Sequence, residues 1–286
     1  MIRRVAVAAF ALCVAAGTWL DPARGSAVKS GAVLIADLHV HPYPGDGSLP
    51  VRELQREAGR RGLDVVAITP HNNRVALGMS RLVGLDPEGP IVLPGQEVTA
   101  PGFHIVALGT ARLVDWRLPA ADAISEIHAQ GGIAIAAHPV DASWRVPGDE
   151  ALRALDGAEV AQPGWRRRNP ARDEFDKFFR RVQAVNPGIA PIGSSDFHMN
   201  APLALCRTYL LTSDHSVAGV LGAIRDGRTV AQDGRGRLIG AAADVAAVEA
   251  HLAASPPPPG VPMRDRLLAL GALLALAALT IRDRQG

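Results

Sequence analysis

The sequence has too few cysteines for a disulfide framework. Only Cys13 and Cys206 are present, each in an apolar run, and a disulfide between them is not expected. The chain also lacks an excess of charge of one sign, because 30 basic residues nearly balance 28 acidic ones and leave a formal net charge of +2. This balance argues against broad nucleic-acid binding, and no nucleic acid is predicted as a stable partner. The cysteine count leaves the redox compartment open.

No internal repeat is visible, and the only low-complexity segment is a short run of prolines. The chain has 286 residues, 48% of them hydrophobic. That length is sufficient for one sizeable domain with a well-buried core and too short for two.

The N-terminal end resembles an export or membrane segment. Arg3 and Arg4 precede an uncharged and mostly apolar run over residues 5–20, and Gly25, Ser26 and Ala27 offer small residues where a peptidase could cut. Basic residues before such a run are typical of a secretory signal peptide or an N-terminal membrane anchor. We therefore predict one of these over residues 1–27, with a plain buried helix as the alternative.

The C-terminal end contains a second apolar run, over residues 267–281, with arginines on both sides. It has no polar stripe, which an amphipathic surface helix would show. We predict a transmembrane helix here, slightly short but extended by arginines that reach the interface; a hydrophobic docking helix is the alternative. A proline-rich linker over 251–266 is expected to be stiff and extended. If Arg3 and Arg4 stay cytoplasmic, the body of the chain lies outside the cytoplasm, in the periplasm or on the outer face.

The body of the chain, about residues 31–250, alternates short β-rich runs with helical stretches. Strands are predicted at 33–36, 65–69, 91–93, 104–108, 133–137, 158–160 and 189–193. Helices are predicted at 51–61, 120–130 and 172–185. Repeated strand-then-helix spacing predicts an α/β fold with a parallel sheet, and about seven strands suggest a barrel. Chemistry in a barrel gathers at the carboxyl ends of the strands.

Six of the nine histidines and three carboxylates fall at or next to these predicted strand ends. The nine residues are His39, His41, Asp46, His71, Glu97, His104, His138, Asp196 and His198. Side chains two positions apart on an extended segment point the same way, so each of the pairs His39–His41 and Asp196–His198 can reach one site. Imidazole and carboxylate are ligands for Zn, Mn and Fe. Nine such groups exceed what one ion can use, so two or three divalent ions are predicted.

The motifs that carry these residues resemble the PHP family, named for polymerase and histidinol phosphatase. In chain order they are Asp37-Leu38-His39-Val40-His41 with Asp46-Gly47, Thr69-Pro70-His71, Gly95-Gln96-Glu97, Phe103-His104, Ala137-His138-Pro139 and Ser195-Asp196-Phe197-His198. The resemblance covers nearly the whole body. It implies a distorted (β/α)7 barrel over residues 31–250 that binds up to three metals.

The resemblance also implies how the ligands are divided among three metal positions. The first position would use His39, His41, Glu97 and Asp196. Glu97 would bridge to the second, held also by His104 and His138, and Asp46, His71 and His198 would hold the third. One departure is that the family usually has Asp where Pro70 stands, at a position beside the ligands rather than on a metal. Pro70 therefore leaves the occupancy of the His71 position open.

The charge of such a site indicates its substrate. Three divalent ions, three carboxylates and a metal-bridging hydroxide leave a net positive charge, which suits an anionic phosphate. Glu97, Asp196 and His138 are the candidate catalytic residues. Arg166 and Arg168 follow the sixth predicted strand and are candidate substrate-binding residues, because guanidinium groups suit phosphate oxygens; ordinary surface charge is the equal alternative.

The function predicted from these features is metal-dependent hydrolysis of phosphate mono- or diesters, with a small-molecule phosphate ester as substrate. The same metals could instead hydrolyse carboxyl or carbamate esters or amides, since the fold alone does not decide the substrate. A third hypothesis is a degenerate domain that serves as a membrane-bound binding or scaffold module. Asp37 is a candidate for orienting a ligand histidine, whereas His128, His215 and His251 are expected to be ordinary surface residues.

Overall fold

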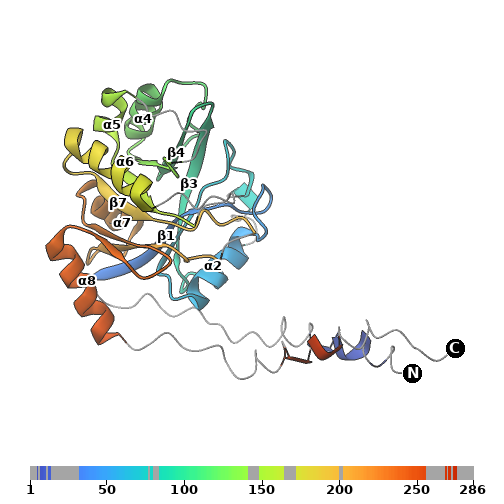
Figure 1. Ribbon diagram of the computed structural model, residues 1–286. Coiled ribbons are helices and arrows are strands. Elements are labelled where there is room, and N and C mark those ends of the chain that lie inside the picture. Colours follow the sequence, from blue (N-terminus) through green and yellow to red (C-terminus); the bar gives the residue numbers. More distant parts are fainter. Residues whose placement is uncertain are drawn as a thin grey trace. The chain divides into compact units, whose positions relative to one another are not determined.

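The computed structural model (Figure 1) describes part of the chain. The described residues are 5, 7–10, 12–13, 32–76, 78–79, 84–140, 148–163, 172–199, 202–255, 268, 270–271 and 273–275. The chain divides into two compact units. One unit spans Arg24–Pro256 and is called the body. The other, called the terminal unit, combines Met1–Ala23 with Pro257–Gly286.

In the terminal unit the described residues of both segments are helical. No helix formed by the described residues is both long enough and apolar enough to cross a membrane. Most of the predicted signal or anchor segment, 1–27, and of the predicted transmembrane helix, 267–281, lies outside those residues. Most of the predicted linker, 251–266, does so as well. The structure therefore does not support these three assignments, and they stay predictions.

The body is built on one sheet whose ten described strands are arranged in the order β10-β9-β8-β1-β2-β3-β4-β5-β6-β7. The strands are β1 (Val33–Val40), β2 (Val65–Ile68), β3 (Ile91–Ala100), β4 (Phe103–Leu108), β5 (Ile133–Ala136), β6 (Gly157–Ala161), β7 (Ala190–Gly193), β8 (Arg207–Leu211), β9 (Thr229–Gln232) and β10 (Leu238–Gly240). The helices are α2 (Val51–Arg60), α4 (Ala120–Ala129), α5 (Asp149–Ala154), α6 (Arg172–Val185), α7 (Val217–Arg225) and α8 (Ala242–Ala254).

The expected α/β fold with a barrel-like sheet is thus confirmed. The prediction of seven parallel strands was wrong. β1, β2 and β3 are parallel, as are β5, β6 and β7, whereas β4 runs antiparallel to both of its neighbours. Only Pro101 and Gly102 join β3 to β4, and a two-residue connection links antiparallel strands alone. Gly102 has a φ of +104°, which glycine adopts readily. The three additional strands, β8 to β10, continue the sheet antiparallel beyond β1.

The sheet curls until it is nearly closed, and threonine side chains connect the two sides of the gap. The hydroxyl of Thr208 on β8 donates to Gly193 O on β7 at 2.8 Å and accepts from Gly193 N at 3.0 Å. Thr229 on β9 donates to Pro191 O on β7 at 2.9 Å. A Cβ atom at Gly193 would lie 2.4 Å from Arg207 O, so only glycine permits this close approach of β7 to β8.

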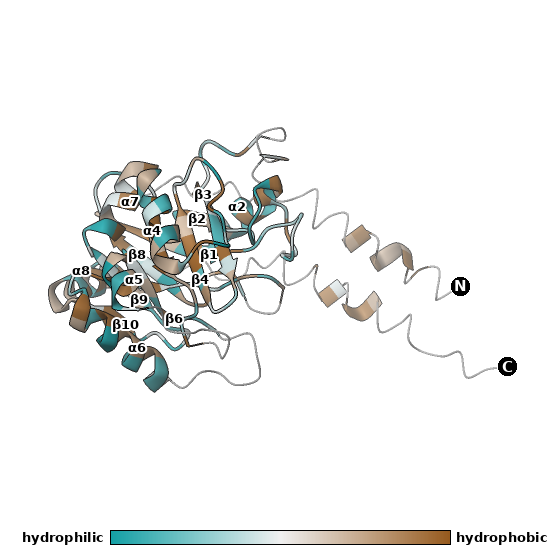
Figure 2. Ribbon diagram, turned by 90° about the horizontal axis from the view of Figure 1, so that it is seen from above, coloured by the Kyte–Doolittle hydropathy of each residue, from teal (hydrophilic) through white to brown (hydrophobic). Residues whose placement is uncertain are grey.

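Helices cover the outside of the curled sheet (Figure 1). Apolar residues of α4, α5 and α6, including Ile127, Leu152 and Val182, pack against β4 to β6, and Leu54 of α2 packs near Val66 of β2. In Figure 2 the strands are largely hydrophobic, while the helices carry hydrophilic faces. This pattern is expected for strands that are covered on both sides, and it leaves the rim of the barrel as the place for polar side chains.

His128 is exposed, as expected for a surface residue, and it pairs with Asp156. Its Nε2 lies 2.8 Å from Asp156 Oδ2, which also accepts from Ala134 N at 2.7 Å. The hydrogen bond to Asp156 raises the pKa of His128 above its ordinary value, and burial and Arg225 oppose this rise. A raised histidine pKa stabilises the fold fully below the unfolded value of about 6.5, and the stabilisation is lost as the pH rises through the folded value.

We expect Asp156→Asn to lower the pKa of His128 toward that ordinary value, because the negative charge that stabilises the imidazolium is removed. An NMR pH titration of the histidine ring signals measures the pKa in the wild type and in the variant. A value for His128 that does not move would show that the contact with Asp156 is not formed in solution.

Candidate metal centre

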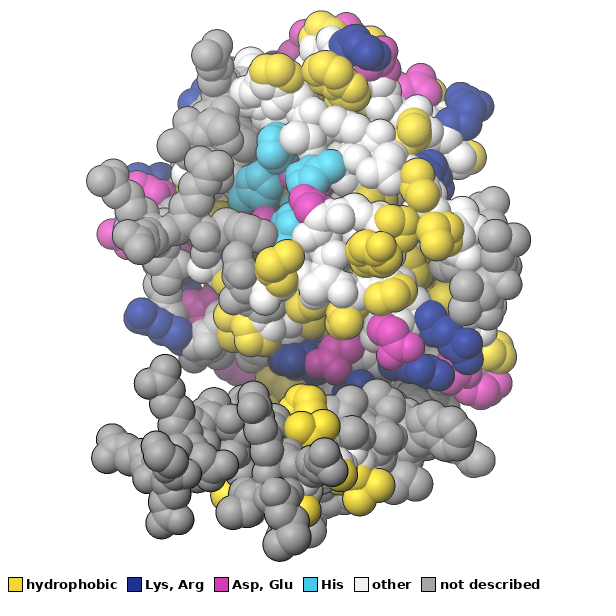
Figure 3. Space-filling view, turned by 90° about the vertical axis from the view of Figure 1, so that its right-hand side faces the viewer, with side chains coloured by type: hydrophobic (Ala, Val, Ile, Leu, Met, Phe, Trp, Pro, Cys, Tyr) yellow, Lys and Arg dark blue, Asp and Glu magenta, His cyan; other side chains and the backbone are white. Residues whose placement is uncertain are grey.

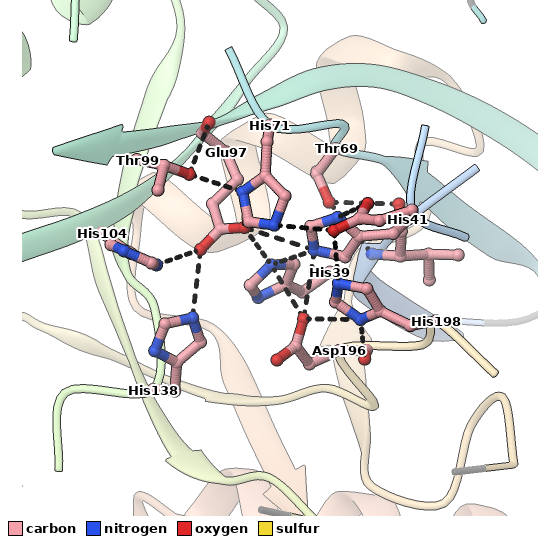
Figure 4. Close-up of polar contacts among 12 residues, drawn as sticks. His39, His41, Thr69, His71, Glu97, Thr99, His104, His138, Asp196 and His198 are labelled. Atoms are coloured by element: carbon pink, nitrogen blue, oxygen red, sulfur yellow. Dashed lines mark hydrogen bonds and ion pairs between the residues drawn. The ribbon is translucent and has the colours of Figure 1, made fainter. Parts of the chain in front are cut away.

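All nine predicted ligands lie together at one end of the barrel, and Figure 4 labels all of them except Asp46. β1, β2, β5 and β7 end at this rim, and β4 begins there because it runs antiparallel to its neighbours. The reversed direction of β4 explains why His104 stands at the start of its strand while His71 and His138 follow theirs. Figure 3 shows histidine side chains at the surface of this face, so the cluster is open to solvent on one side.

Hydrogen bonds fix which ring nitrogen carries the proton in two of the histidines. Nδ1 of His39 lies 2.9 Å from Glu159 Oε1, and Nδ1 of His198 lies 2.9 Å from the backbone oxygen of Asp196. Neither a carboxylate nor a carbonyl oxygen can donate, so each Nδ1 carries the hydrogen. When these rings are neutral, as metal binding requires, the lone pair of each Nε2 is directed into the cluster.

The most deeply buried part of the cluster contains His39, His41 and Asp196, called the inner group. The two Nε2 atoms lie 3.0 Å apart, and Asp196 Oδ1 is 3.4 Å from Nε2 of His39 and 3.1 Å from Nε2 of His41. Ligand atoms from all three residues lie within 4.8 Å of one another. A cation between these atoms would account for their convergence, because two neutral rings and a carboxylate oxygen all offer lone pairs toward the same point.

Glu97 lies at the centre and joins the inner group to the histidines of β4 and β5. Its Oε1 is 2.7 Å from His104 Nδ1 and 3.0 Å from His138 Nε2, while its Oε2 is 3.4 Å from His39 Nε2. The side chain is fully buried. A carboxylate with its two oxygens directed toward different histidines has the geometry of a bridging ligand, and His39, Glu97 and His138 form a second group that could hold an ion.

The third group consists of His41, Asp46, His71 and His198, and it is called the outer group. Asp46 Oδ2 lies 3.1 Å from Nε2 of both His71 and His198, and Asp46 Oδ1 is 3.3 Å from His41 Nδ1. The side chains of Asp46 and His71 are 48% and 34% exposed, respectively, whereas that of His39 is 1% exposed. The outer group therefore faces the solvent, and the inner group does not.

The charges of the cluster also fit bound cations. Burial alone would lower the pKa of His41, but hydrogen bonds with Asp196, Asp46 and Glu97 raise it to about 10. Burial likewise opposes a rise at His71, yet Asp46 and Glu97 raise its pKa to about 9. The carboxylates thus require positive charge among the rings. His138 Nδ1 is buried without a hydrogen-bond partner among the described residues, and such an atom fits coordination better than proton sharing.

Two of the ligand positions are held in an unfavourable backbone conformation. His138 has a φ of +30° and Asp196 has a φ of +48°, which residues with a Cβ rarely adopt. His138 N donates to Glu159 Oε2, and Gln162 donates to Asp196 Oδ2 at 2.9 Å. Backbone strain of this kind is typical of functional sites, where the surrounding structure maintains it.

The structure groups these ligands differently from the predicted division. His41 belongs to the outer group as well as to the inner group, and His39 lies with Glu97 and His138 as well as in the inner group. His104 contacts Glu97 without belonging to any of the three groups. Pro70 contributes its backbone oxygen, which accepts from Glu97 N at 3.1 Å. Arg166 and Arg168 lie outside the described residues, so their predicted contact with substrate stays a prediction.

Asp37 orients a loop rather than a histidine ring. Its Oδ1 accepts from Ser195 N at 3.0 Å and its Oδ2 accepts from Ala204 N at 2.8 Å. Burial raises the pKa of Asp37 to about 6, although these hydrogen bonds oppose the rise. Asp37 therefore connects β1 to the segment that carries Asp196.

Sequence reasoning missed Glu159, which lies on β6 and is fully buried. It accepts from His39 Nδ1, from His138 N and from the hydroxyl of Ser194. Its position in the middle of a short apolar strand could have indicated that it has a role in the site, because a buried charge requires partners. Thr99, whose Oγ1 lies 2.5 Å from His71 Nδ1, gave no comparable signal.

The loop that carries Asp46 depends on the small size of Gly47. A Cβ atom at this position would lie 1.8 Å from His41 O, a distance that the backbone cannot accommodate without moving. We expect Gly47→Ala to displace Asp46 from His71 and His198 and to weaken metal binding at the outer group by about 10-fold or more. Chelator competition on the purified chain measures this loss; an unchanged affinity would show that the loop tolerates the methyl group.

The fold and the site together define a PHP-like barrel with a cluster of histidines and carboxylates that could hold metal ions. No model of a protein family matches the chain. A curated protein of Methanocaldococcus jannaschii, named Uncharacterized protein MJ1587, is 33% identical over 138 residues, which cover 44% of this chain and 80% of that protein. The chain belongs to the same family as this archaeal protein, whose name states no activity.

A solved structure shows the same fold at lower identity. A two-domain protein from Bacteroides vulgatus, described as containing a predicted PHP-like metal-dependent phosphoesterase, matches with a TM-score of 0.55 at 20% identity. The match covers 72% of this chain and 66% of that chain, so this chain spans just under two thirds of that protein. An amidohydrolase from Chromobacterium violaceum, solved with bound sulfate and no metal, reaches a TM-score of only 0.42 at 20% identity, covering 57% of this chain and 87% of that chain. The resemblance to the PHP family that the motifs predicted is confirmed at the level of the fold.

Proposed function

We propose that the chain is a metal-dependent phosphoesterase that hydrolyses phosphate mono- or diesters of small molecules. The observation that carries the proposal is the convergence of His39 Nε2, His41 Nε2 and Asp196 Oδ1 beside the buried carboxylate of Glu97. Two or three divalent ions bound here, of Zn, Mn or Fe, would supply an activated water and neutralise the phosphoryl oxygens.

The chain's own residues have separable parts in this proposal. Glu97, Asp196 and His138 hold the buried side of the site in a fixed geometry. Asp46 and His71 form its solvent-facing side, where a substrate can enter because both side chains are partly exposed. Arg166 and Arg168 are proposed to pair with the phosphate, on the strength of the sequence alone.

Hydrolysis of a carboxyl or carbamate ester or an amide is the second candidate. It is favoured by the exposed side chains of Tyr43 and Met199, which are 58% and 66% exposed and stand next in the chain to the His41 and His198 segments. An apolar flank of this kind suits an uncharged substrate. The two candidates share the metals and differ in the charge of the substrate.

The test is the release of nitrophenol by the full chain supplied with Mn or Zn. Bis(4-nitrophenyl) phosphate, 4-nitrophenyl phosphate and 4-nitrophenyl acetate are compared, each with the wild type and with His138→Ala. Turnover of either phosphate ester that is lost in the variant would support the proposal. Turnover of the acetate alone would favour the second candidate, and metal-loaded protein that is inactive on all three would contradict both.

A membrane tether is proposed from the sequence alone, with the body on the extracytoplasmic side. The two apolar segments, 1–27 and 267–281, support it. Alkaline carbonate extraction of membranes tests the tether, because a peripheral protein would be released and an anchored one retained.

A further inference from the structure

β6 differs from the other strands that the sequence predicted, because it brings no ligand to the rim. None of the nine ligands lies between the beginning of β6 and the beginning of α6. Instead, β6 contributes two buried polar side chains, Glu159 within the strand and Gln162 directly after it. Ser194 N donates to Ala161 O at 3.0 Å, which holds the end of β6 against the segment that follows β7. Gln162 is therefore placed beside the segment that carries Asp196.

The two oxygens of the Asp196 carboxylate have different surroundings. Oδ1 is directed toward the rings of the cluster, 3.4 Å from His39 Nε2 and 3.1 Å from His41 Nε2. Oδ2 points away from these rings (Figure 4) and accepts from the side-chain amide of Gln162 at 2.9 Å. An ionised carboxylate only accepts hydrogen bonds, so the NH₂ group of Gln162, and not its oxygen, faces Asp196.

The carboxylate needs such a contact because its own torsion does not fix it. Rotation about the bond to the carboxyl group of aspartate has broad energy wells, so without a partner Asp196 could turn either oxygen, or both, toward the rings. A hydrogen bond from N–H to a charged oxygen is stronger than one between neutral groups. Both side chains are buried, so water does not compete for this bond. The contact with Gln162 therefore selects one orientation of the carboxylate.

The absence of charge on the amide also matters. An arginine or lysine in the same place would form an ion pair with Asp196 and reduce the negative charge that the carboxylate offers to a cation. The amide of Gln162 fixes the carboxylate and carries no positive charge itself. Oδ1 therefore keeps its charge and its lone pairs on the side of His39 and His41.

We propose that Gln162 is a positioning residue that holds Asp196 by Oδ2, so that Oδ1 alone is directed toward the two histidines of the inner group. The proposal rests on the proposed metal site and extends it, since it adds a residue that acts on the ions only through Asp196. Gln162 prepares this ligand before an ion arrives.

The first test is the affinity of the full chain for Zn, measured by competition with a chromophoric chelator. Gln162→Met removes the donor and keeps the length of an unbranched side chain. It is expected to weaken the binding of Zn by about 10-fold, because partners that orient a ligand contribute this much to metal affinity. The absorption spectrum of the Co(II)-loaded chain, which reports the coordination of the ion, is expected to change as well.

Gln55→Met is the matched control. Gln55 is also a buried glutamine, and its amide donates at 2.9 Å to the backbone oxygens of Asp86 and Pro90, outside the site. The control is expected to lose stability in the same way and to keep the Zn affinity and the Co(II) spectrum of the wild type. Should Gln162→Met fail to fold, Gln162→Asn retains the amide but draws it back by one methylene group, with a smaller loss of affinity.

A second test does not depend on metal. In crystal structures of the metal-free full chain, Oδ2 of Asp196 is expected beside the amide of Gln162 in the wild type. In Gln162→Met this oxygen has lost a donor and faces an apolar side chain, so the carboxylate is expected to turn. A wild type that binds no metal would contradict the proposed function, while the orientation of Asp196 would still decide this inference. An unchanged carboxylate in Gln162→Met, or a Zn affinity that falls no further than in Gln55→Met, would overturn it.

Discussion

Replacement of Glu97 by Gln is expected to reduce turnover by more than about 100-fold and to remove metal from the purified chain. Glu97 contacts more of the ligand histidines than any other described carboxylate, with Oε1 beside His104 and His138 and Oε2 beside His39, His41 and His71. An amide would replace one of these oxygens with NH₂, which cannot bind a cation and would repel it. The loss should exceed that of any residue that touches only one group.

The measurement is kcat/KM on whichever ester the wild type hydrolyses, together with elemental analysis of both proteins. Glu126→Gln is the matched control, since Glu126 is a carboxylate on α4 that pairs with Arg112 and is 37% exposed. It should leave metal content and turnover unchanged. A Glu97→Gln variant that keeps its metal and its activity would show that the central carboxylate does not bind the ions.

Chelation is expected to abolish turnover and to change how thermal stability depends on pH. Without metal, the carboxylates raise the pKa of His41 to about 10 and that of His71 to about 9, against burial. A raised histidine pKa stabilises the fold fully below the unfolded value of about 6.5, and the stabilisation is lost as the pH rises through the folded value. The metal-free chain should therefore lose stability between about pH 6.5 and pH 10.

The metal-loaded chain should behave differently in the same range. Metal binding requires neutral imidazole, so the affinity should rise with pH, by up to about tenfold per unit for each proton released. The carboxylates, whose pKa values lie below their ordinary range at Glu97 and Asp196, do not titrate in this range. The difference in Tm between loaded and chelated protein is therefore expected to widen from pH 6 to pH 9. Equal pH dependence in both forms would contradict the assignment of these histidines as ligands.

The sequence predicted the elements that end at the site better than those that close the barrel. All seven expected strands are present, because each is a short apolar run. β8 to β10 and helices α5, α7 and α8 were not predicted. β10 has only three residues, none of them buried, and this is too short for a residue pattern to identify a strand. Strand direction was also missed at β4, because residue periodicity does not encode direction; Pro101 and Gly102 were the available signal.

The candidate site was predictable because its residues are rare types at strand ends. Histidine and carboxylate in the order of the PHP motifs identified the nine candidates, and the structure brings them together. What the sequence could not provide is the contacts that orient them. Glu159 lies 120 positions from His39, and Thr99 lies 28 positions from His71. Such pairs are defined only once the barrel has closed.

The metal content of the full chain, purified without chelator and measured by mass spectrometry of the elements, tests the central claim most directly. The predicted result is two or three equivalents of Zn, Mn or Fe per chain in the wild type. Glu126→Gln should retain this metal, and Glu97→Gln should lose it. A wild-type chain that carries no tightly bound divalent metal, and takes up none when it is supplied, would contradict a metallohydrolase and favour a binding or scaffold module.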